Sequence, residues 1–178
     1  MRRLNFSSFA RILVVLLATS ALSEPQSAPL KQGETLPALV GQTLTGKALD
    51  LPTDAAGKAA VILFSFSRAG GRDAQNWSQR LAKDKPQLPS YTIIFIESVP
   101  RLFRSVAISG IRSGMPPALL DRTLIFEQQQ NVWERRLQVT DENSAYVIVL
   151  DPAGKLLRTL SGPFADRAYA GLFQELRP

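Results

Sequence analysis

The chain of 178 residues contains no cysteine and no histidine. Without a thiolate it cannot attack a disulfide or a peroxide through sulfur, and it cannot bind zinc through cysteine or cysteine–histidine sets. It also cannot form a Ser-His-Asp or Cys-His catalytic relay. No run of carboxylates matches an EF-hand loop, and no two carboxylates are paired as a general acid and base. We therefore expect a binding protein, not an enzyme, with no metal and no cofactor.

The charge balance is mildly basic, with 21 Lys and Arg against 15 Asp and Glu and a net charge of +6. Arg2, Arg3 and Arg11 lie in an N-terminal segment without acids, and without them the count is 18 against 15, a net of +3. No basic run contains the interleaved aromatic residues that are typical of nucleic-acid binding, so no nucleic-acid partner is expected. The hydrophobic share of 45% is that of a globular chain that folds without disulfides.

Residues 1–23 have the three parts of an export signal. Arg2 and Arg3 form a basic start, residues 12–18 form a short apolar centre, and small residues lead to Ser23. The pattern predicts cleavage after Ser23 and an exported protein, either periplasmic or otherwise extracytoplasmic. The alternative is an N-terminal anchor that is kept, which would make the protein membrane-associated.

The rest of the chain predicts one α/β domain, residues 33–178, after a disordered linker over residues 24–32. A hairpin at the edge of the sheet, with strands near 39–40 and 49–51, is expected first. Further strands are predicted at 59–66, 91–96, 124–126, 146–150 and 156–160, and helices after Asp73, over 102–111, over 129–137, and around Tyr169, Leu172, Phe173 and Leu176. Parallel crossovers followed by a hairpin and a last helix are the thioredoxin arrangement.

The strand over residues 59–66 is followed by Arg68-Ala69-Gly70-Gly71-Arg72. We predict a glycine turn here, followed by a helix that Asp73 caps. One interpretation is an anion or carboxylate site, made by Arg68, Arg72 and the helix N-terminus. The alternative is two solvated arginines, with the glycines present only for the backbone geometry.

Three spaced features resemble the extracytoplasmic thioredoxin-like and peroxiredoxin-like proteins. They are Gly33 with Pro37, Gly57-Lys58 before the strand that ends at Ser67, and the segment from Tyr146 to Gly154 with Lys155. The resemblance implies a central mixed sheet flanked by helices, with an N-terminal β-hairpin extension.

The chain departs from that family at two positions that matter for redox chemistry. Ala69 and Arg72 stand where these proteins carry the Cys-x-x-Cys cysteines, and Ala145 stands where they carry a cis-proline. The resemblance therefore implies the fold without thiol–disulfide oxidoreductase or peroxidase activity.

A narrower resemblance concerns Ser65-Phe66-Ser67-Arg68 leading to Trp77, and Leu137-Gln138-Val139 running through 143–147 to Asp151. These motifs are similar to the chaperone family that helps assemble the membrane sector of mitochondrial F-type ATP synthase. The resemblance implies an envelope or membrane protein as partner, with membrane contact only through that partner or through an uncleaved N-terminal segment. The binding residues expected around the old active-site end are Arg68, Gly70, Gly71, Arg72, Asp73, Trp77, Asn143 and Ser144.

Three hypotheses remain open from the sequence. The first is a non-catalytic binding or assembly protein, and the second is a thioredoxin-scaffold protein that binds an anionic small molecule or substrate at Arg68 and Arg72. The third is a structural subunit of an envelope complex with no site of its own. Trp77 is either a core residue or a ligand platform. Trp133, beside Arg135 and Arg136, is either a core residue or an alternative partner-binding patch.

Overall fold

The computed structural model describes residues 28–173 of the chain. The predicted signal segment, residues 1–23, and Leu176 of the last predicted helix lie outside the described residues. Signal cleavage and export therefore stay predictions.

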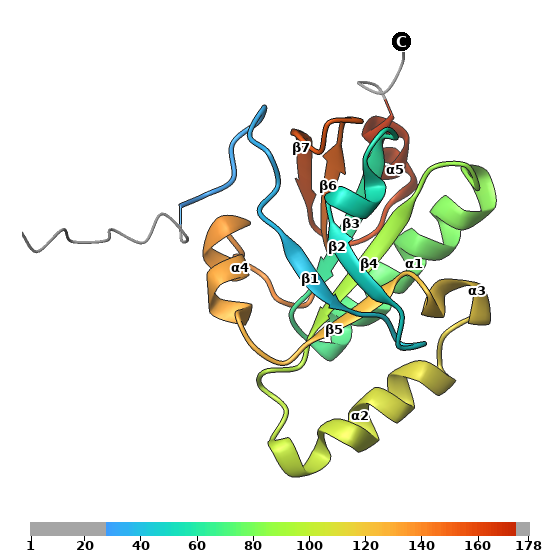
Figure 1. Ribbon diagram of the computed structural model, residues 1–178, viewed down its shortest axis with the longest axis vertical. Coiled ribbons are helices and arrows are strands. Elements are labelled where there is room, and N and C mark those ends of the chain that lie inside the picture. Colours follow the sequence, from blue (N-terminus) through green and yellow to red (C-terminus); the bar gives the residue numbers. More distant parts are fainter. Residues whose placement is uncertain (1–27, 174–178) are drawn as a thin grey trace, which may run out of the picture.

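The centre of the molecule is a five-stranded mixed sheet with the strand order β5-β4-β3-β6-β7 (Figure 1). Strands β3, β4 and β5 are parallel, whereas β6 is antiparallel to β3, and β7 is antiparallel to β6. The strands are β3 (Ala60–Ser65), β4 (Ser90–Phe95), β5 (Thr123–Phe126), β6 (Tyr146–Leu150) and β7 (Leu156–Ser161). This strand order, with its parallel and antiparallel pairs, confirms the predicted thioredoxin-like α/β fold. The long apolar runs of the sequence form the central strands, as expected for strands covered on both faces.

The N-terminal hairpin is present as predicted, with β1 (Leu39–Gln42) antiparallel to β2 (Ala48–Leu51). It forms a separate two-stranded sheet, and an isolated antiparallel bridge between Thr43 and Leu124 joins its end to β5, the edge strand of the main sheet, in agreement with the predicted edge position. The buried residues Leu39, Leu49 and Leu51 pack with the same core cluster as Ile62 of β3. The hairpin therefore lies at the β5 edge and covers one face of the main sheet.

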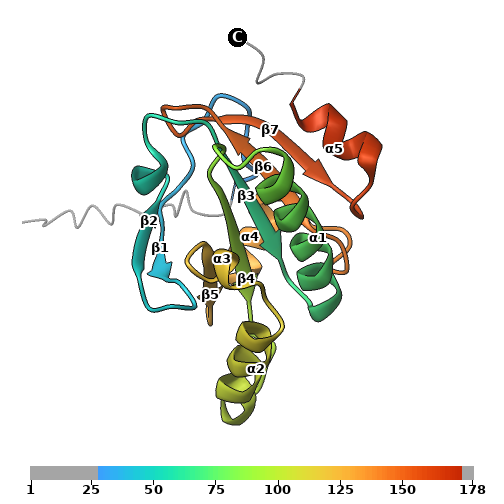
Figure 2. The ribbon, with the colours of Figure 1, turned by 90° about the vertical axis from the view of Figure 1, so that its right-hand side faces the viewer.

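Helices cover both faces of the sheet. Helices α1 (Arg68–Asp84) and α5 (Asp166–Leu172) pack on the face opposite the hairpin (Figure 2). Helix α4 (Gln130–Arg136) packs on the hairpin side through Trp133. The short elements are η2 (Thr53–Ala55) and α3 (Pro117–Leu120). The sheet is thus the middle layer of a three-layer domain.

The predicted glycine turn is wrong, because Gly70 and Gly71 lie inside the first turns of α1. The helix begins at Arg68 with Ser67 as its N-cap, and the Gly70 N–H donates to Ser67 Oγ over 3.1 Å. Asp73 is therefore a residue within the helix and not its cap. Serine is among the preferred N-cap residues, and it satisfies one of the free N–H groups at the helix start.

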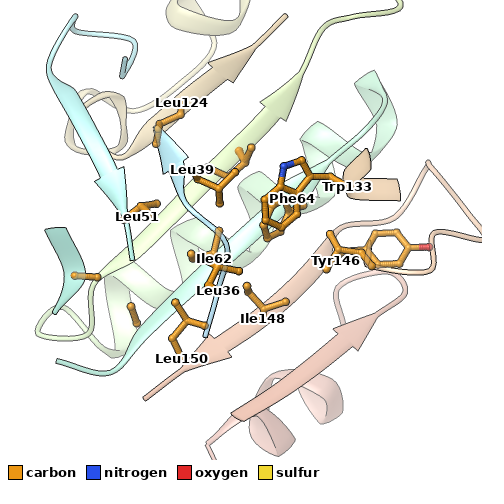
Figure 3. Close-up of a cluster of buried hydrophobic side chains, with 14 of the residues drawn as sticks. Leu36, Leu39, Leu51, Ile62, Phe64, Leu124, Trp133, Tyr146, Ile148 and Leu150 are labelled. Carbon is orange, nitrogen blue, oxygen red and sulfur yellow. The ribbon is translucent and has the colours of Figure 1, made fainter. Parts of the chain in front are cut away.

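Both tryptophans are core residues, which was one of the two interpretations given for each of them. Trp133 is 2% exposed and stacks on Phe64, with ring centroids 5.0 Å apart (Figure 3). Trp77 is 1% exposed and meets the edge of the Phe164 ring, with centroids 5.2 Å apart. Neither indole is available as a platform on the surface.

The structure describes residues 28–32 of the predicted linker, residues 24–32, and Leu30 among them contacts the domain. The Leu30 N–H donates to the Arg136 carbonyl over 2.9 Å, and the Leu30 side chain packs against the core cluster beneath the hairpin. Burial of the apolar Leu30 side chain against the core is favourable and stabilises the ordered position of this segment. The ordered domain therefore begins before Gly33.

Helix α2 (Arg101–Ser113) forms where the apolar spacing predicted a helix, and Gly114 follows its last residue. None of its 13 residues is buried. In both ribbon views it extends from one end of the domain, away from the layers of the fold (Figures 1 and 2).

We expect the variant Phe64→Ala to lose roughly 3–5 kcal/mol of unfolding free energy, as is usual for a fully buried ring cut back to alanine. Phe64 is 0% exposed and stacks on Trp133 in the centre of the sheet. The matched control is Leu102→Ala, because Leu102 is 81% exposed and should change stability by no more than about 0.5 kcal/mol. Urea denaturation measures both, and equal losses in the two variants would contradict the packing described.

Candidate functional site

The candidate site lies where the carboxyl end of β3 leads into α1. We call it the α1 end and define it as residues 67–73 together with residues 140–145, the loop that precedes β6. This region corresponds to the old active-site end expected from the sequence. It contains all of the predicted binding residues except Trp77, whose ring lies in the core.

The hydroxyl of Ser67 joins the two parts of the α1 end. Ser67 Oγ accepts from the Gly70 N–H at 3.1 Å and donates to the Glu142 carbonyl at 2.8 Å. The Gly71 N–H is also used, since it donates to the Ser67 carbonyl at 2.9 Å. These N–H groups at the start of the helix are thus satisfied within the fold and do not face outward for an anion.

The loop backbone lies directly against Gly70. A Cβ atom at this position would lie 2.6 Å from the Glu142 carbonyl oxygen and 3.1 Å from that of Ser144. A Cβ at Gly71 would meet only Ser65 Oγ, at 3.8 Å. Gly70 is therefore required for a close approach between helix and loop, and Gly71 is not.

Asp73 connects α1 to the loop over residues 140–145 and to the segment that follows β7. Its Oδ2 accepts from the Ala145 N–H at 2.9 Å, and its Oδ1 accepts from the Phe164 N–H at 2.7 Å. Ala145 stands where a proline was expected from the family pattern, and a proline has no N–H to donate. Alanine in place of proline at position 145 thus allows the hydrogen bond to the Asp73 carboxylate that holds the backbone directly before β6 against α1.

The loop over residues 140–145 is also held internally. The Asp141 carboxylate accepts from Ser144 Oγ at 2.7 Å and from the Asn143 N–H at 2.9 Å. These hydrogen bonds, with the one from Ser144 the largest contribution, lower the pKa of the Asp141 carboxyl below its ordinary value. The Tyr146 hydroxyl accepts from the N–H groups of Thr140 and Asp141, at 2.9 and 3.1 Å. Internal hydrogen bonds therefore hold this loop in a defined conformation.

What the α1 end offers to a partner is a small set of exposed polar side chains. Arg68 and Arg72 are exposed and four residues apart, so they lie on one side of α1. Within residues 28–173 neither guanidinium has a hydrogen-bond or ion-pair partner. Asn143 is exposed beside them, with its Oδ1 3.4 Å from Ser67 Oγ, whereas Ser144 is 5% exposed. The geometry supports binding of carboxylates or carbonyl groups through Arg68 and Arg72.

The alternative patch around Trp133 does not form as an aromatic surface. Trp133 is buried, and the Arg136 guanidinium lies over its ring, 5.1 Å from the centroid. Such a cation–π contact stabilises the helix packing.

Two contacts of the α1 end, made by Ser67 within it and by Phe164 outside it, were not predicted from the sequence. Ser67 directly follows the apolar run and precedes the helix, and serine at such a position is an N-cap signal that could have been recognised. The backbone of Phe164 is distant in sequence, and nothing local indicates that its N–H reaches Asp73.

Groups of three or more potential metal ligands do not occur within residues 28–173. In that same part of the chain, no helix combines the length and apolar character needed to cross a membrane.

A family model described as ATP10 protein matches residues 21–168, which is most of the chain. No curated protein sequence gives a significant match. The family match confirms the narrower resemblance noted in the sequence.

Solved structures resemble the chain in fold. A putative thiol:disulfide interchange protein DsbE from Chlorobium tepidum is 18% identical with a TM-score of 0.59, and the match covers 83% of this chain and 96% of that one. A putative thiol-disulfide oxidoreductase from Bacteroides vulgatus is 12% identical with a TM-score of 0.57, covering 78% and 86%. BsSco, described as a member of the Sco family of cytochrome c oxidase assembly proteins, is 12% identical with a TM-score of 0.52, covering 81% and 95%. At these identities the likeness shows the fold.

We expect Gly70→Ala to destabilise the protein by about 1–3 kcal/mol, because its Cβ would overlap the Glu142 carbonyl oxygen and the loop would have to move. Gly71→Ala is the matched control in the same helix. It should be neutral or stabilising by up to about 1 kcal/mol, since alanine is the better helix former and the space is open. Thermal denaturation of the two variants distinguishes them, and a loss of equal size in both would contradict the close contact at Gly70.

Proposed function

Because this chain belongs to the ATP10 protein family, we propose that it is an exported, non-catalytic assembly factor that binds a subunit of the membrane sector of an F-type ATP synthase. The observation that carries the proposal is that the α1 end lacks cysteines and is covered by the loop over residues 140–145. Neither of the two positions that bear cysteines in redox-active relatives bears one here, and the loop over residues 140–145 closes over the helix start. The scaffold is retained while the residues for thiol chemistry are absent.

The binding surface in this proposal is the exposed side of the α1 end. Arg68 and Arg72 carry ten N–H donors on two guanidinium groups, roughly five on each. A polar loop of a membrane protein, with carboxylates and free backbone carbonyls, is a suitable ligand for them. Asn143 adds an amide that can both donate and accept.

The structure gives less support to the small-molecule alternative at Arg68 and Arg72. An anion site at a helix start draws on free N–H groups, but the Gly70 N–H already donates to Ser67 Oγ. The loop carbonyls of Glu142 and Ser144 also lie against Gly70 and would repel an anion there. Two exposed arginines alone suit an extended protein surface better than an enclosed small ligand.

We expect the double variant Arg68→Ala/Arg72→Ala to capture at least about tenfold less of the ATP synthase membrane-sector subunits than the parent chain, since losing both guanidinium anchors costs more than one factor of ten in affinity. The measurement is pull-down from detergent-solubilised membranes of the same organism, with quantification by mass spectrometry.

Export is tested separately: N-terminal sequencing of the bait recovered from the envelope should begin near Glu24.

The matched control is Lys58→Ala/Lys155→Ala, which removes the same charge from exposed lysines outside the α1 end. This variant should capture its partner as the parent does. If the parent enriches no ATP synthase subunit, the assembly proposal is wrong. If the arginine variant captures as well as the control, the α1 end is not the surface that binds.

The chain should also leave the rate of insulin-disulfide reduction, and of peroxide consumption, at the rate of buffer alone. The sequence contains no cysteine and therefore no thiol that could turn over a disulfide or a peroxide. A spectrophotometric assay with dithiothreitol as reductant tests this, with a Cys-x-x-Cys thioredoxin as positive control. A rate of disulfide reduction or peroxide consumption above that of buffer, which persists after repeated purification of the protein, would refute the non-redox assignment.

A further inference from the structure

Helix α2 exposes more large apolar surface than any other helix in the described part of the chain. Leu102 is 81% exposed, Phe103 57% and Val106 69%. Leu102 and Val106 are four residues apart with Phe103 beside them, so the three side chains share one side of the helix. Gly110 continues the same side without a side chain. Exposed apolar residues gathered in this way mark an interaction surface.

The charges of α2 are all of one sign. The helix carries Arg101, Arg104 and Arg112 and no acidic residue. Arg101 and Arg112 are exposed and eleven residues apart, about three turns, so they lie on the same flank of the apolar side. The charge of Arg104 is compensated by Glu127, at 2.9 Å. The exposed surface of α2 thus combines an apolar stripe with an uncompensated basic flank.

The helix is fixed to the domain although none of it is buried. Arg104 donates to the Val99 and Glu97 carbonyls at 3.0 and 3.2 Å, and Arg112 donates to the Leu44 carbonyl at 3.1 Å. Gln75 of α1 also donates to the Gly114 carbonyl at 3.1 Å, directly after the last turn of α2. The apolar stripe is therefore presented in a defined direction at the end of the molecule (Figures 1 and 2).

We propose that α2 lies in the surface of an anionic lipid bilayer, with Leu102, Phe103 and Val106 among the acyl chains and Arg101 and Arg112 at the headgroups. Charge complementarity favours this occupant, because a helix without acids beside an apolar stripe suits anionic headgroups above hydrocarbon. The protruding position also favours it, since a flat bilayer needs access to a convex edge and no complementary groove. This inference goes beyond the proposed function and does not depend on it.

The contact would orient the whole domain. Strands β3 and β4 are parallel, so α1 and α2 both begin at the carboxyl edge of the sheet. A bilayer that holds α2 is therefore on the side of the molecule where α1 begins. Arg68 and Arg72 would then face a region in which loops of membrane proteins emerge.

The absence of native cysteine provides a specific test on the full chain. A single cysteine introduced as Phe103→Cys carries an environment-sensitive fluorophore, and Val40→Cys, on β1 and 66% exposed, carries the matched control label. Both proteins are mixed with vesicles of phosphatidylcholine alone and of phosphatidylcholine with phosphatidylglycerol. Only the label at position 103 should shift to the blue and become shielded from iodide, and only with the anionic vesicles. A native N-terminal segment that bound lipid would not produce this difference between labels.

Two unlabelled variants test the residues themselves by vesicle flotation. Leu102→Ser/Phe103→Ser/Val106→Ser should lower the partition onto anionic vesicles by more than about tenfold relative to Val40→Ser, and Arg101→Gln by about fivefold. Circular dichroism verifies that the variants remain folded. The proposal is overturned if the label at 103 responds no more than the label at 40, or responds equally to neutral vesicles. It is also overturned if shielding needs membranes that contain protein, which would assign α2 to a protein partner.

Discussion

The bridge made by the Asp73 carboxylate is the interaction on which the candidate site depends. One oxygen accepts from Ala145, directly before β6, and the other accepts from Phe164, after β7. A single side chain from α1 thus fixes both ends of the β6–β7 hairpin to the helix that follows β3. Buried or half-buried N–H groups need such partners, and a carboxylate is the strongest acceptor among the side chains. The position of the loop over residues 140–145, and therefore the shape of the α1 end, follows from this bridge.

The departures from a redox-active thioredoxin fit together around it. Ala145 supplies an N–H that a proline lacks, Gly70 allows the loop carbonyls to reach the helix, and Ser67 caps the helix while bonding to Glu142. With no cysteine at positions 69 and 72, there is no need for an open groove beside a dithiol. What remains exposed is a basic edge made by Arg68 and Arg72. Such an edge suits recognition of a protein partner, in keeping with the function proposed for this chain.

Much of the fold could be predicted from the sequence, because continuous apolar runs such as 60–65 and 146–150 indicate strands buried on both faces, and Asp151 to Gly154 indicates a tight turn. The start of α1 was misplaced, since Asp73 is a good cap locally but is engaged by backbone N–H groups distant in sequence. The edge position of the hairpin was predicted, but not that β1 and β2 form a sheet of their own, because strand patterns do not say which sheet a strand joins. Apolar periodicity located α2 correctly, yet it could not show that Leu102 and Phe103 face away from the core, since exposure depends on tertiary packing.

Hydrogen exchange at the Ala145 and Phe164 amides, measured by NMR in the parent chain and in Asp73→Asn, tests the closed α1 end most directly. The structure predicts that both amides are protected in the parent, because each donates to Asp73. Both should exchange faster in the variant, since an amide side chain offers one acceptor oxygen in place of two, while amides in the centre of β3 and β4 stay protected. Fast exchange of both amides in the parent chain would show that this end of the molecule is open, and would contradict the account of a thioredoxin-like fold in which hydrogen bonds to Asp73 close the α1 end.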